Sequence, residues 1–214
     1  MIQSLSCTGL ESTYGLYPSL SRLLSLLEVE EVGFSLHQHL QLANPTATTT
    51  PLHPHDDLDH SLDFIKDWKE RLPLLNSDFQ FVEPVLATRC SLLYCLLQSA
   101  AAEVKGHCAA PPTGLRRRVE HLFDAMTESL LTRAEFAREA GCYQVCEGAL
   151  FALKQHVSLL GSYGVPESLY PALPWMLKIE EAKLSWERKD TTLAMAQLKT
   201  LLNKFTVVCE LKYW

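Results

Sequence analysis

Apolar residues recur at the spacing of an α-helix along most of this 214-residue chain. Leucine, valine and aromatic residues follow one another three or four positions apart, whereas no alternation with a period of two is long enough to build a sheet. Stretches rich in proline and glycine separate the helical segments. The sequence therefore predicts an all-α fold: an α-solenoid of antiparallel helix pairs, similar to tetratricopeptide or HEAT repeats, with a loose bundle as the alternative.

The same spacing sets the expected elements. Helices are expected at residues 18–42, 58–72, 84–103, 115–140, 142–160, 174–186 and 191–203. The first could divide at Gly33, and Pro84 suits the first turn of the third. Loops are expected at about 44–57 and 104–114. Asp190 is placed to cap the last helix, which so short a link makes antiparallel to its predecessor.

Tryptophans and other large apolar residues mark the expected buried sides of these helices. Trp68, Trp175 and Trp186 lie on apolar stripes and are expected to pack between helices. In the last hairpin the stripe comprises Met176, Ile179, Ala182, the stem of Lys183, and Trp186.

Composition and charge exclude several classes of protein. Hydrophobic residues make up 47% of the chain and charged residues 21%, which argues against disorder over most of its length. No apolar run approaches the roughly 20 residues of a membrane span, and no basic start precedes an apolar core as in a secretory signal. An intracellular protein with no membrane partner is expected. A net charge of −6 gives no reason to expect direct nucleic-acid binding, and the basic run Arg116–Arg118 is interpreted as a solvated helix flank.

Sequence motifs of catalysis are absent. The chain has neither GxGxxG nor GxxxxGK[ST] for phosphates, no HRD or DFG triplet of a kinase, and no GxSxG elbow. No catalytic residue, cofactor site or metal site is therefore predicted.

Histidines and carboxylates gather in one region without metal-ligand spacing. His37 and His39 form an HQH triplet, and a proline-rich loop follows that cannot fix a tetrahedral site by itself. That loop and the residues after it contain His53, His55, Asp56, Asp57, Asp59 and His60. A solvated loop is the favoured interpretation, and zinc binding is the alternative.

The 7 cysteines are an odd number scattered through helical segments, which predicts free thiols. Cys90, Cys95, Cys142 and Cys146 are expected to be small buried apolar residues. A nucleophilic pair could combine Cys95 or Cys142 with His156 or His121, but no motif brings them together, and core packing is favoured. The sequence therefore ranks a thiol or metal enzyme last.

Three blocks carry a family resemblance. They are LESTYGLYPSLSRL from Leu10, SLDFIKDWKERLPLLNSDFQFVEPVLATR from Ser61, and LKIEEAKLSWERKDTTLAMAQLKTLL from Leu177. Together and in this order they resemble the FAT region, the helical repeats N-terminal to the kinase domain in ATM-like phosphatidylinositol-3-kinase-related kinases. The resemblance covers most of residues 9–204. Residues 44–57, 101–114 and 206–214 depart from it.

The resemblance implies a partial FAT-type repeat domain at residues 1–205, followed by a divergent tail at 206–214. It implies a non-catalytic segment that braces the kinase domain of a nuclear serine/threonine kinase signalling DNA double-strand breaks. The implied partners are that kinase domain, further FAT helices and a second copy of the parent in a homodimer. The chain is expected to be a fragment of such a kinase. A free-standing helical-repeat adaptor is the alternative. Tyr14, Tyr17 and Pro18 are interpreted as packing and turn residues at one end of a repeat.

Overall fold

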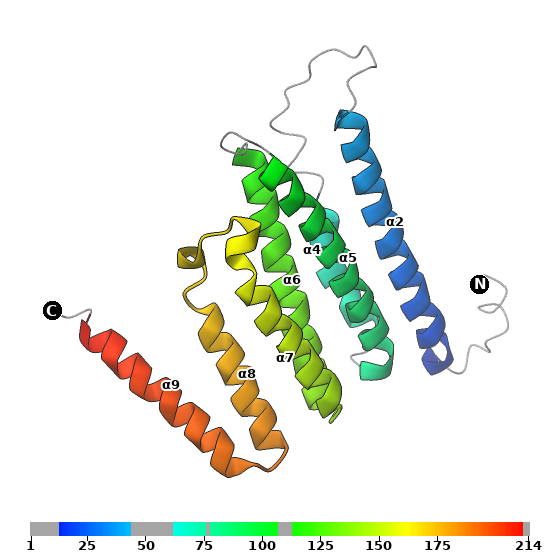
Figure 1. The fold of residues 1–214 in the computed structure, drawn as a ribbon. Coiled ribbons are helices and arrows are strands. Elements are labelled where there is room, and N and C mark those ends of the chain that lie inside the picture. Colours follow the sequence, from blue (N-terminus) through cyan, green and yellow to red (C-terminus); the bar gives the residue numbers. More distant parts are fainter. Residues whose placement is uncertain (1–12, 44–61, 76–77, 107–112, 212–214) are drawn as a thin grey trace. The chain divides into compact units, whose positions relative to one another are not determined.

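A computed structural model describes residues 13–43, 62–75, 78–106 and 113–211, and their side chains apart from those of 38–43 and 204–211. Every regular element in these ranges is a helix, which confirms the all-α prediction (Figure 1). The α-helices are α2 (Tyr17–Ala43), α4 (Phe64–Arg71), α5 (Phe79–Gly106), α6 (Thr113–Glu139), α7 (Tyr143–Ser158), α8 (Leu173–Glu187) and α9 (Thr191–Leu211). Short 3₁₀ helices are η1 (Thr13–Leu16), η2 (Leu72–Leu75), η3 (Leu160–Tyr163) and η4 (Glu167–Leu169).

The chain divides into two compact units, Met1–Ser129 and Leu130–Trp214. In the first unit, α2 packs along α5, and the short helix α4 packs against α2. The buried side of α5 is formed by leucine, valine and alanine spaced three and four apart, which is why this helix is central to the core. Gly33 does not divide α2, since the helix runs unbroken from Tyr17 to Ala43.

The start of α5 differs from the prediction. The helix begins at Phe79 and Pro84 lies inside it, so the interpretation of Pro84 as a first-turn residue is wrong. Asp78 begins the helix: its carbonyl accepts from Phe81 N–H at 3.0 Å, and its carboxylate accepts from Gln80 N–H at 3.2 Å. Pro84 is exposed and comes about one turn after the start of α5, so its ring projects to solvent. Because proline has no N–H, one backbone hydrogen bond of the helix is lost at this position.

In the second unit, α7, α8 and α9 pack in sequence, with α8 between the other two (Figure 1). The predicted cap at Asp190 is confirmed, because its Oδ1 accepts from Leu193 N–H at 3.1 Å. The α6–α7 link turns at Gly141, whose φ of +72° is a left-handed conformation that a side chain would strain. Helix α9 extends to Leu211, eight residues past its expected end.

Within the described residues, α5 is the one helix long and apolar enough to cross a membrane by length and composition. Half of its most apolar window is buried inside the protein. A core helix of a water-exposed domain has the same properties, and the packing of α5 on α2 fits that role.

Candidate functional site

An aromatic cluster joins the start of the described chain to the start of α5. The rings of Tyr14 and Tyr17 lie 5.3 Å and 5.5 Å from that of Phe81. The Tyr14 hydroxyl donates to Asp78 at 2.9 Å, and the buried Ser21 hydroxyl donates to the Phe81 carbonyl at 2.7 Å. These contacts confirm that the tyrosines of the first resemblance block are packing residues.

A buried ion pair that the sequence analysis did not identify lies between α2 and α5. Arg89 Nε donates to Glu28 Oε1 at 2.7 Å, and Arg89 Nη2 donates to the Trp68 carbonyl at 2.6 Å. The Glu28 side chain has no exposed surface, and that of Arg89 is 4% exposed. The guanidinium also lies 5.6 Å from the centre of the Trp68 ring. One arginine thus links three helices, α2, α4 and α5.

A second carboxylate of α2, that of Glu31, accepts hydrogen bonds from side chains of α4. Glu31 accepts from the Trp68 indole N–H at 2.8 Å and from both terminal nitrogens of Arg71, at 2.6 Å and 3.0 Å. We refer to Glu28, Glu31, Trp68, Arg71 and Arg89 as the clasp. A Glu pair spaced i, i+3 on an otherwise leucine-rich helix, facing W-x-x-R, is the sequence signal that could have revealed it.

Two opposing effects act on the pKa of Glu28 in the clasp. Burial raises the pKa of Glu28, while the hydrogen bond and charge of Arg89 lower it, and burial has the larger effect. Oε2 of Glu28 has no hydrogen-bond partner among the described residues. The arrangement holds charge inside the protein but contains no nucleophile, which favours a structural role.

The predicted cysteine environments are half right. Cys90 and Cys146 are buried as expected, whereas Cys95 and Cys142 are exposed. Cys142 is the N-cap residue of α7 and not part of its buried side, which is why its surroundings differ from those of Cys146. Burial raises the pKa of the Cys146 thiol to about 11, which keeps it protonated at neutral pH.

Alkylation should separate these thiols. With the native protein and iodoacetamide at neutral pH, we expect Cys95 and Cys142 to be modified at least about tenfold faster than Cys90 and Cys146, because only the exposed pair is accessible to the reagent. Peptide mass spectrometry against time measures each site. Rates in the native protein as equal as those in a urea-unfolded control would contradict the described packing.

The other candidate ligands do not form a site in the part of the chain that is described. His156 is buried with its ring 6.1 Å from that of Tyr163, while His121 and His37 are exposed. No group of three His, Cys, Asp or Glu side chains that could hold a metal occurs there. The side chain of His39 and all of His53, His55, Asp56, Asp57, Asp59 and His60 lie outside the described residues. Zinc binding by that loop is therefore an untested alternative.

The basic run also differs in part from its interpretation. Arg116 and Arg117 are exposed, as a solvated flank requires, but Arg118 is buried. Its burial lowers the pKa of the guanidinium, and the charge of Glu103 opposes this change.

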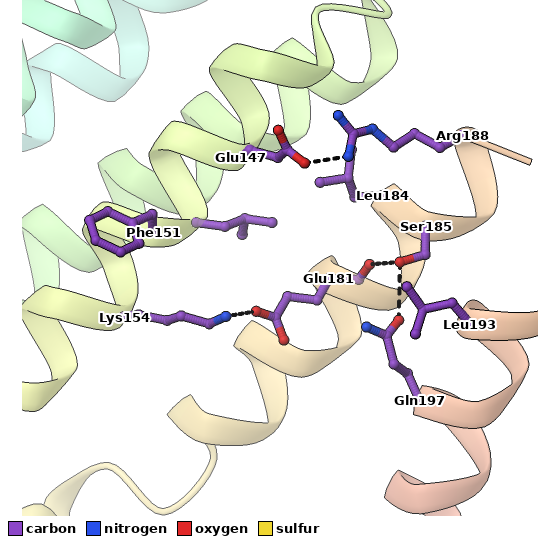
Figure 2. Close-up of a pocket in the computed structure, with 10 residues that line it drawn as sticks. Glu147, Phe151, Lys154, Glu181, Leu184, Ser185, Arg188, Leu193 and Gln197 are labelled. Carbon is purple, nitrogen blue, oxygen red and sulfur yellow. Dashed lines mark hydrogen bonds and ion pairs between the residues drawn. The ribbon is translucent and has the colours of Figure 1, made fainter. Parts of the chain in front are cut away.

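A groove of about 390 Å³ lies between α7, α8 and α9. Figure 2 shows how its charged residues pair across the helices: Lys154 with Glu181, and Glu147 with Arg188. Ser185 on α8 contacts Gln197 on α9 at 3.2 Å. The charged residues of the groove are thus paired with one another, and apolar side chains such as Phe151 and Leu193 line it beside them.

The apolar stripe predicted as the buried side of α8 is mostly exposed. Trp186 is 55% exposed, and Met176 and Ile179 are exposed as well, so only Ala182 of the expected set is in the core. The buried leucines of α8 are Leu173, Leu177 and Leu184. At 100° per residue, α8 therefore has a packed side and a separate exposed apolar side.

Helix α9 continues this exposed surface. Met195, Leu198 and Leu202 are exposed and share one side of α9, away from the buried Ala194 and Leu201. Helices α8 and α9 pack against each other, so each helix of this hairpin has an exposed apolar stripe beside its packed side. We call the combined surface, Met176, Ile179, Trp186, Met195, Leu198 and Leu202, the outer face.

Antiparallel helix pairs without any strand in the described residues define this chain as a helical-repeat protein. The FAT domain family matches residues 1–209, and the chain belongs to this family. It is 30% identical over 204 residues to a protein of Sus scrofa, "Serine-protein kinase ATM". That alignment covers 95% of this chain and 5% of the relative, so the chain spans a small part of the protein it matches. The match is to a FAT domain and not to a kinase domain.

Proposed function

We propose that this chain acts as a non-catalytic scaffold segment of an ATM-like serine/threonine kinase of the nuclear DNA-damage response. Its helices brace the kinase domain and contribute to assembly, including the homodimer of the parent protein. Neither direct nucleic-acid binding nor membrane insertion is part of this role. The outer face carries the proposal, because exposed Trp, Ile, Leu and Met on one side of a terminal hairpin are what the next repeat of a solenoid covers.

The family membership supports the same function. A chain matched over 209 of its residues by the FAT domain, and similar to a kinase of far greater length, fits a segment that works through contacts with neighbouring helices. The clasp fits this function as well, since it fixes the relative positions of three helices without offering a reactive group.

The alternative is a free-standing adaptor, and the groove is the observation in its favour. Its apolar side chains and internally paired charges suit an apolar side of a partner helix. Full-length transcript sequencing separates the two functions. An open frame that continues into further FAT helices and a kinase domain is the expected result; a stop codon with no kinase sequence downstream favours the adaptor.

Substitutions on the outer face test its assignment as an interface. We expect Ile179→Gln with Leu198→Gln to lower the free energy of unfolding by only about 1 kcal/mol per site, because each side chain already exposes more than a third of its surface. The double variant should also bind less of a hydrophobic dye than the native chain. Leu177→Gln, on the buried side of α8, is the matched control and should be strongly destabilising. Equal destabilisation by both variants would show that the outer face is core.

A further inference from the structure

We draw no further inference here: the strongest candidate, the groove that α7, α8 and α9 line around Phe151 and Leu193, has its charged residues paired with one another, and nothing in the described part of the chain shows what covers it.

Discussion

Replacing Arg89 by methionine is expected to lower the free energy of unfolding of the first unit by about 3–5 kcal/mol. The substitution keeps much of the side-chain volume but leaves the Glu28 carboxylate buried without its cation. It also removes the hydrogen bond that the Trp68 carbonyl accepts at 2.6 Å. Urea unfolding followed by far-ultraviolet circular dichroism measures the change.

The double variant Glu28→Leu with Arg89→Met gives the decisive comparison. Removing both charges also removes the desolvation penalty of each, so the double variant should be more stable than Arg89→Met alone by at least about 2 kcal/mol. Arg71→Met, which breaks a partly exposed pair with Glu31, is the matched control and should have a smaller effect. If the double variant were as unstable as the single one, the ion pair would not be the source of the loss.

The spacing of apolar residues predicted most of the helices, because each helix buries leucine and valine at regular intervals. The cap at Asp190 followed from a local rule, since a capping carboxylate acts on its immediate neighbours. Of the predicted loops, residues 44–57 and 107–112 lie outside the described part of the chain, whereas 104–106 and 113–114 are helical. Pro84 shows the limit of such rules. A proline is tolerated near the start of a helix at more than one position, and the competing signal from Asp78 determined which one.

The exposure of the α8 stripe and the buried ion pair of the clasp were harder to predict. A stripe of Met176, Ile179 and Trp186 has the same spacing whether its partner helix is present or absent, so periodicity predicted burial where the structure has exposure. Conversely, the sequence contains Glu28 and Arg89 as two charges 61 positions apart, and only the pairing of α2 with α5 brings them within 2.6 Å. Both features depend on which other segment packs against a helix, and local spacing does not show this.

Replacing Trp68 by alanine is expected to cost about 3–5 kcal/mol of unfolding free energy. The indole is 2% exposed, packs 5.2 Å from the Phe64 ring, and donates its N–H to Glu31 at 2.8 Å. Alanine would leave a cavity between α4 and α2 and an acceptor on Glu31 without one of its donors. Trp68→Phe, which keeps much of the ring but loses the N–H, should lie between the native chain and Trp68→Ala.

Trp186→Ala is the matched control because the two tryptophans have the same sequence signature and opposite surroundings. With 55% of its surface already in solvent, Trp186 should contribute on the order of 1–2 kcal/mol to stability, clearly less than Trp68. Urea unfolding of the two alanine variants under the same conditions measures the difference. A large loss of stability from both substitutions would place Trp186 in a core, whereas negligible effects of both would contradict the packing of α4 on α2 through Trp68.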